Sequence, residues 1–120
     1  MIVESLVTTL DAEGLPNVAP MGVLWGEAEI VLKPYRETTT FRNLEATGEA
    51  VVNLVDDVRL FVESALATPV LPCVPAAVVK GVVLEAVCSW RELRVRESET
   101  QTPRARFVCA LRSVVSRPPV

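Results

Sequence analysis

The sequence has no histidine among its 120 residues. This absence excludes Ser-His and Cys-His catalysis, histidine metal sites and proton transfer by imidazole. Cysteine is also scarce, and Cys73, Cys88 and Cys109 show neither the Cys-x-x-Cys spacing of a zinc site nor a disulfide pattern. We expect all three thiols to be reduced and buried as small hydrophobic side chains. Any chemistry is therefore expected to belong to a bound cofactor.

The sequence also lacks a basic patch, a signal peptide and an unbroken apolar run. The net charge is −3 and the twelve basic residues are scattered, so nothing indicates a nucleic-acid partner. Residues 68–88 are apolar but include three prolines, a lysine and a glutamate, which would break or charge a membrane helix. The N-terminus has no basic region or cleavage site. These absences predict a cytoplasmic protein that binds neither nucleic acid nor a membrane.

Apolar residues, by contrast, are abundant. They make up 50% of the chain and give a mean hydropathy of +0.35, which is more than a small soluble monomer needs. We therefore expect part of the surface to be buried in a homodimer. The length fits one domain over residues 1–120. Because the sequence stops directly after a predicted strand, we expect either a longer protein or a partner that covers that edge.

The pattern of apolar residues predicts a mainly β domain with short helices. Extended segments at 2–11 and 14–26 are joined by the turn "DAEG", and a third strand follows at 30–34, with Ile30 and Leu32 on one side. A short helix is predicted at 38–48, ending at Gly48, then a strand at 49–55 and a second helix at 58–66. We expect a proline-rich loop at 67–77 and two long strands at 80–98 and 104–115. Hairpin connections between short strands favour a small antiparallel barrel.

Basic and hydroxyl side chains gather where the first predicted helix begins. The unpaired N–H groups and the dipole at a helix start favour an anion, and arginine can hold a phosphate through two hydrogen bonds. Asn43 would point elsewhere and reach another part of a ligand. The alternative is an ordinary threonine cap with solvated arginines. The residues of this group are Arg36, Thr38, Thr39, Thr40 and Arg42.

The predicted strand "NVAPMGVLWG" is interrupted by Pro20 and Gly22. Proline removes a ladder donor and glycine removes a side chain, which suggests a strand edge or a planar ligand against the backbone. A β-bulge at a barrel corner would explain the same residues.

Other polar and aromatic residues receive structural interpretations. Asp56 and Asp57 are interpreted as a helix cap and not as a carboxylate pair, and we expect no metal site. Trp25 and Trp90 are interpreted as packing residues. Six charged residues between positions 91 and 99 are predicted to form a solvated strand face: Arg91, Glu92, Arg94, Arg96, Glu97 and Glu99.

Three stretches together resemble a known family. "APMGV", "LKPYRETTTFRNLEATGEAVVNLVDDVRLFVESAL" and "RARFVCALRSVVSRPP" are similar to proteins of unestablished function with the FMN-binding split-barrel fold, related to flavin reductases and pyridoxamine-phosphate oxidases. The resemblance implies a dimer with FMN at the subunit interface and a C-terminal helical portion that this sequence lacks. It also implies contacts of the ring system with Met21, Gly22 and Val23. The phosphate and ribityl chain would meet Arg36, Thr38, Thr39, Thr40 and Asn43.

A shared fold does not determine an activity. The leading hypothesis is an FMN-binding flavoprotein, with an oxidoreductase activity in which FMN carries hydride or electrons. A second hypothesis is a flavin reductase that uses FMN as substrate and reduced nicotinamide as donor. A third, of a different class, is a non-catalytic module that stores FMN or serves only as a structural dimer.

Overall fold

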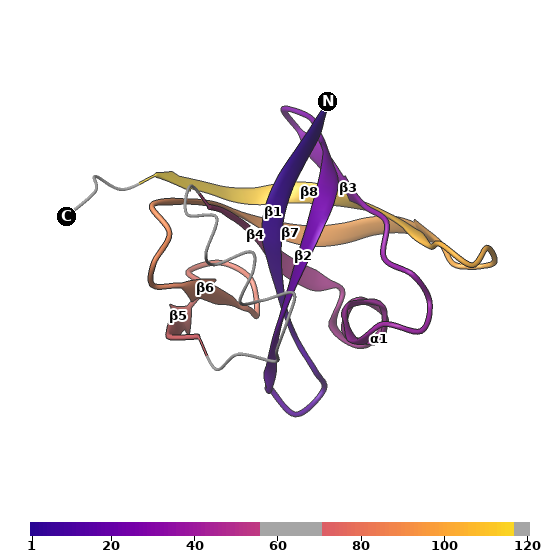
Figure 1. The fold of residues 1–120 in the computed structure, drawn as a ribbon, viewed down its shortest axis with the longest axis horizontal. Coiled ribbons are helices and arrows are strands. Elements are labelled where there is room, and N and C mark those ends of the chain that lie inside the picture. The colour runs from indigo at the N-terminus through magenta and orange to yellow at the C-terminus, as the bar shows by residue number, and fades with distance from the viewer. Residues whose placement is uncertain (56–70, 117–120) are drawn as a thin grey trace.

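A computed structural model describes residues 1–55 and 71–116. The predicted second helix, together with Asp56 and Asp57, lies outside these residues. The described elements, drawn in Figure 1, are β1 (Ile2–Leu10), β2 (Pro16–Trp25), β3 (Glu29–Leu32), α1 (Thr39–Thr47), β4 (Glu49–Leu54), β5 (Cys73–Pro75), β6 (Val82–Leu84), β7 (Ser89–Glu99) and β8 (Arg106–Ser116).

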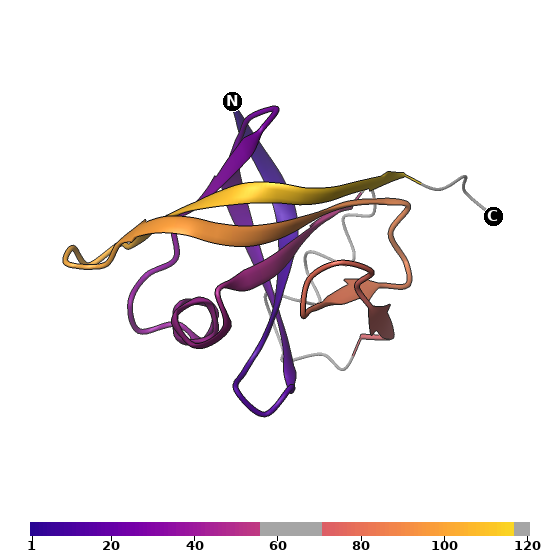
Figure 2. The same ribbon diagram turned by 180° about the vertical axis from the view of Figure 1, so that it is seen from behind.

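Six strands form a closed antiparallel barrel in the order β1-β2-β3-β8-β7-β4. The prediction of a small antiparallel barrel is thus confirmed. Figures 1 and 2 show the long β7–β8 hairpin crossing the body of the barrel, with its connecting loop beyond α1. The β5–β6 pair forms a separate small sheet beside β1 and β4. Every barrel strand pairs with two neighbours, although β2 and β3 pair over only two residue pairs.

The opening hairpin agrees with the sequence prediction. Gly14 has a φ of +89°, and the Asp11 carboxylate accepts backbone hydrogen bonds from Glu13 at 2.8 Å and Leu15 at 2.9 Å. Across the whole described β1–β2 ladder the register runs from Ile2↔Leu24 to Leu10↔Pro16 without a shift. The β-bulge interpretation of Pro20 and Gly22 is therefore wrong.

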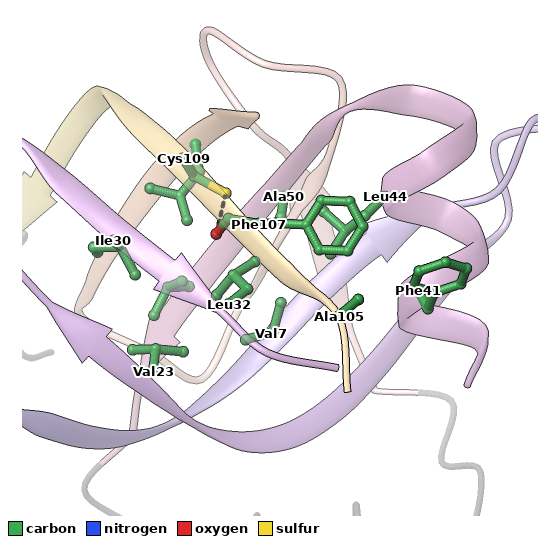
Figure 3. Packing of buried hydrophobic residues seen from close by; sticks show 12 residues of the cluster. Val7, Val23, Ile30, Leu32, Phe41, Leu44, Ala50, Ala105, Phe107 and Cys109 are labelled. Carbon is green, nitrogen blue, oxygen red and sulfur yellow. Dashed lines mark hydrogen bonds between the residues drawn. The ribbon is translucent and has the colours of Figure 1, made fainter. Parts of the chain in front are cut away.

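The barrel interior is filled by alternate strand residues and by one face of α1. Ile30 and Leu32 are fully buried, as the alternation predicts. Phe41 of α1 meets Phe107 of β8 edge to face, with 5.8 Å between ring centroids (Figure 3). Burying one such large side chain stabilises the fold by about 1.5–3 kcal/mol. The helix is thereby fixed over one end of the barrel.

Helix α1 begins and ends where the sequence predicts. Thr38 is the N-cap, and its Oγ1 accepts a hydrogen bond from the Phe41 N–H at 3.2 Å. Gly48 ends the helix with a φ of 69°, in the left-handed region that favours glycine. The threonine-cap interpretation of the helix start is confirmed.

The segment after residue 70 differs from prediction. Residues 73–75, expected in a loop, form β5, which pairs with β6 from Cys73↔Leu84 to Pro75↔Val82. The expected long strand at 80–98 is divided into β6 and β7 by a turn at residues 85–88. Asn53 of β4 holds β6 against the barrel, because its Oδ1 accepts a hydrogen bond from the Leu84 N–H at 3.0 Å. This long-range bond has no signal in the local sequence.

Two side-chain predictions are also wrong. Glu92, expected on a solvated face, is fully buried, and Cys88, expected in the core, is exposed. Cys109 is buried as predicted, and burial raises the pKa of its thiol to about 12, so this thiol is unreactive. Trp90 is buried and Trp25 packs against the core, which confirms both as packing residues.

The Glu92 carboxylate lies in a ring of donors. Its oxygens accept the N–H groups of Ala77 at 3.2 Å, Val78 at 2.7 Å and Val79 at 3.1 Å, and the Trp90 indole N–H at 3.3 Å. Burial by itself would raise the pKa of Glu92. The three backbone donors and the indole outweigh that effect and hold the pKa below its ordinary value. Glu92 thus fastens the connection between β5 and β6 to β7.

Candidate functional site

The barrel is open between β2 and the segment that follows β3. Within the described residues β2 pairs with β3 only at Leu24↔Val31 and Trp25↔Ile30, so the remainder of this edge of β2 has no strand beside it. A cavity of about 300 Å³ lies in this opening, next to the start of α1. It is lined by Ala19, Pro20, Met21, Gly22, Lys33, Pro34, Tyr35, Thr38, Thr40 and Arg104.

The open edge of β2 offers main-chain hydrogen-bonding groups. Trp25 N–H donates to Met1 O at 2.8 Å, and bonded and non-bonded pairs alternate along an antiparallel ladder. The even-numbered residues Val18, Pro20 and Gly22 therefore direct their backbone groups away from β1, toward the opening. Pro20 occupies a position where no bond to β1 is needed. The edge interpretation of this stretch is confirmed.

The glycine at position 22 also has a structural explanation. A Cβ at this position would lie 2.8 Å from Cγ2 of Ile2 and 3.0 Å from Oε1 of Glu4. Because Gly22 is opposite Glu4 in the ladder, a side chain at position 22 would require the exposed side chains of Ile2 and Glu4 to shift. The glycine by itself is therefore no sign of a ligand.

Two hydroxyl groups of the helix start face the cavity. Thr38 Oγ1 donates to Tyr35 O at 2.7 Å and caps the helix, so its hydrogen is already used. Thr40 is 2% exposed, and its Oγ1 accepts a long bond of 3.4 Å from Asn17 Nδ2. Among the described residues, the hydroxyl hydrogen of Thr40 has no acceptor. Since a buried hydroxyl without an acceptor is unfavourable, Thr40 is suited to donate into the cavity.

Two cations line the cavity, and sequence reasoning missed both. They are Lys33, at the end of β3, and Arg104, in the loop before β8. None of the described lining residues is acidic, although the whole chain carries a net charge of −3. The cavity is therefore a local positive region, suited to an anion. No local pattern marks Arg104, because long-range contacts, among them the Tyr35↔Arg104 bridge, bring this loop to the site.

Half of the predicted site residues line this cavity. Met21 and Gly22 do so from β2, and Thr38 and Thr40 do so from the helix start. The other predicted residues lie elsewhere: Val23 is buried in the core, Arg36 and Thr39 are exposed outside the cavity, and Asn43 is buried with its Nδ2 bonded to Thr9 Oγ1 at 3.0 Å. Arg42, also considered from sequence, bonds to Thr39 Oγ1 at 3.0 Å.

A larger cavity, of about 550 Å³, lies at the opposite end of α1 beside the β1–β2 turn. Its charged lining residues are Asp11, Glu13, Glu49 and Lys80, so acidic groups dominate. The C-terminal end of a helix dipole also disfavours an anion. This cavity is the less suitable of the two for a phosphate.

Two further observations concern metals and membranes. Among residues 1–55 and 71–116, no group of three or more histidine, cysteine or acidic residues could hold a metal ion. In the same ranges, no helix is long and apolar enough to cross a membrane.

Solved structures share this fold at low sequence identity. An FMN-bound protein of Methanosarcina mazei superposes with a TM-score of 0.81 and 20% identity over 99% of this chain, which spans 65% of that protein. A putative flavin reductase with a split-barrel domain from Shewanella frigidimarina superposes with a TM-score of 0.83 and 12% identity. The match covers 94% of this chain and 66% of that protein. Flavoredoxin of Desulfovibrio vulgaris superposes with a TM-score of 0.79 and 17% identity, over 96% of this chain and 69% of that protein. The chain therefore has the split-barrel fold.

The comparison with curated proteins gave no match. Residues 3–116 match the family described as "Protein of unknown function (DUF447) N-terminal domain", and the Methanosarcina mazei structure carries the same family designation. The chain belongs to the DUF447 family, and residues 3–116 match the N-terminal domain of that family.

Proposed function

We propose that this domain binds FMN in the opening between β2 and the segment after β3. The observation that carries the proposal is the cavity itself, which combines two cations, no acidic lining residue and the start of a helix. The FMN bound to the Methanosarcina mazei protein of the same family supports the choice of ligand.

The phosphate end of FMN fits the start of α1. The Thr40 hydroxyl is buried, faces the cavity and has a hydrogen to donate, while Lys33 supplies a positive charge. Unpaired N–H groups of the first helical turn and the helix dipole add to the attraction. Charge-assisted hydrogen bonds of this kind contribute about 1.5–3 kcal/mol each.

The ring system fits the open edge of β2. Isoalloxazine carries both hydrogen-bond donors and acceptors at its polar end, and the backbone groups of Val18, Pro20 and Gly22 point toward the opening. Met21 offers an adaptable apolar contact beside them. Of the residues predicted from sequence, Val23, Arg36, Thr39 and Asn43 do not line this cavity, and their contacts with FMN stay predictions.

A second subunit would complete the site. At about 300 Å³ the cavity is at the lower limit of ligand pockets, so this chain alone would enclose FMN only in part. Exposed apolar side chains, among them Tyr35 at 52% exposure in the cavity lining, are suited to burial against a partner. We accordingly propose a cytoplasmic homodimer with FMN at its interface.

The chemistry would be that of the flavin, which carries hydride or electrons when bound. Among the described lining residues there is no carboxylate, thiol or imidazole to act as a general acid or base near neutral pH. The chain would bind the phosphate, orient the ring against β2 and exclude water from one face.

The visible absorption spectrum of the purified protein, recorded before and after denaturation with mass spectrometry of the released molecule, tests the proposal. We expect a flavin spectrum and released FMN, or stoichiometric uptake of added FMN. A colourless protein that takes up no FMN would overturn it. If FMN binds, oxidation of reduced nicotinamide on adding excess FMN would separate a flavin reductase from a passive FMN-binding module.

A further inference from the structure

The loop that carries Arg104 is fixed against the segment that follows β3. Ala105 N–H donates to Pro34 O at 2.9 Å, and Arg36 N–H donates to Pro103 O at 3.1 Å. These backbone bonds hold the loop and the segment together on both sides of the Tyr35↔Arg104 bridge. Arg104 therefore reaches the cavity from a fixed backbone.

The Arg104 guanidinium is held as well. Its Nε donates to Lys33 O at 2.9 Å, and its Cζ lies 5.3 Å from the centroid of the Tyr35 ring. Stacking and the Nε bond orient the plane of the group. In the described chain its two terminal amino groups have no hydrogen-bond partner, so both are available to a ligand.

These free donors matter because Arg104 lines the cavity together with Lys33, Thr38 and Thr40. A planar guanidinium matches two phosphate oxygens, whereas the oxidised isoalloxazine ring and the ribityl chain carry no anionic group. An arginine already oriented by other contacts loses little conformational freedom on binding. Its contribution would therefore act on a phosphate and little on the rest of a flavin.

We infer that Arg104 is the residue that makes the site selective for a phosphate-bearing flavin over riboflavin, the same molecule without the phosphate. The inference rests on the proposed function and deepens it. The competing explanation is that Arg104 only fastens the loop to the Lys33–Arg36 segment; that role would affect FMN and riboflavin equally.

Equilibrium binding of FMN and of riboflavin, measured by flavin fluorescence on the full protein, distinguishes these two roles of Arg104. Arg104→Gln should weaken FMN binding about ten- to a hundred-fold and riboflavin binding less than about two-fold. Arg106→Gln is the matched control, since Arg106 is also exposed and is near in the chain but does not line the cavity. We expect both affinities of this control to change less than about two-fold.

Each outcome has a distinct meaning. If wild-type protein binds neither flavin, the proposed function fails. If wild type binds FMN and Arg104→Gln weakens both flavins by the same factor, or leaves the preference for FMN unchanged, the inference about Arg104 is overturned while the FMN site stands. Retained riboflavin binding also shows that the variant is folded.

Discussion

A single carboxylate controls how the β5–β6 connection is held. Glu92 is fully buried, yet four N–H donors surround it, so the negative charge is stabilised without a cationic partner among the described residues. Hydrogen bonds to a charged group are stronger than neutral ones. In the sequence Glu92 lies between Arg91 and Arg94, a pattern that predicts a solvated face.

Glu92→Gln should lower the free energy of unfolding. The glutamine amide group turns donors toward N–H groups that need an acceptor, and leaving a buried donor unpaired costs about 1–3 kcal/mol. Urea unfolding at pH 7 measures the change. Glu97→Gln, on an exposed position of the same strand, is the control and should stay within about 0.5 kcal/mol of wild type. Equal stability of the two variants would contradict the role given to Glu92.

The same residue predicts a pH dependence. Because the folded pKa of Glu92 lies below its ordinary value of 4.5, the stabilisation is fully present above that value and is lost as the pH falls through the folded pKa. The difference in stability between wild type and Glu92→Gln should therefore shrink as the pH falls below 4.5. A difference that stays constant as the pH is lowered until the domain unfolds would show that the charge of Glu92 is not what stabilises the fold.

At the scale of elements, the chain specifies α1 with local signals. Thr38 at the N-cap, Phe41 and Leu44 on the buried face and Gly48 at the end are all readable from the sequence, and each has its predicted role. The β5–β6 sheet has no such signals, because it depends on bonds from Asn53 and Glu92 that come from distant strands.

Gly48→Ala should destabilise the domain by about 1 kcal/mol. Space is no obstacle, since nothing lies within 4 Å of a Cβ built at Gly48, but the φ of +69° is strained for alanine. Gly48→Asn should cost less, because asparagine tolerates this conformation. Thermal or urea unfolding checks both, and an alanine variant as stable as wild type would show that the helix end rearranges.

At the scale of the whole molecule, the antiparallel barrel was predictable because its hairpins and alternation are local. The candidate site was predictable only in part. Thr38, Thr40, Met21 and Gly22 lie near one another in the opening, and the threonines and the interrupted strand mark them in the sequence. Lys33 and Arg104 could not be found, since their meeting depends on the register of β3 against β8 and on the loop before β8.

The proposed dimer is a property of the whole molecule too. Sedimentation equilibrium in the presence of FMN should give twice the chain mass of 13.1 kDa, with one FMN for each chain. Dilution should release FMN together with dissociation, because the partner supplies part of the site. Stoichiometric FMN on a monomer at every concentration would contradict the interface location.

The most direct test of the FMN site compares the only two lysines of the chain. Lys33 lines the proposed site, whereas Lys80 lines the acidic cavity at the other end of α1, and both changes to glutamine remove one charge. The measurement is the dissociation constant of FMN for wild type, Lys33→Gln and Lys80→Gln at one ionic strength. We expect Lys33→Gln to weaken binding about ten-fold, or about 1.4 kcal/mol, and Lys80→Gln to leave it within about two-fold of wild type. Equal effects of both substitutions, or a larger effect at Lys80, would show that FMN does not bind in the opening beside β2.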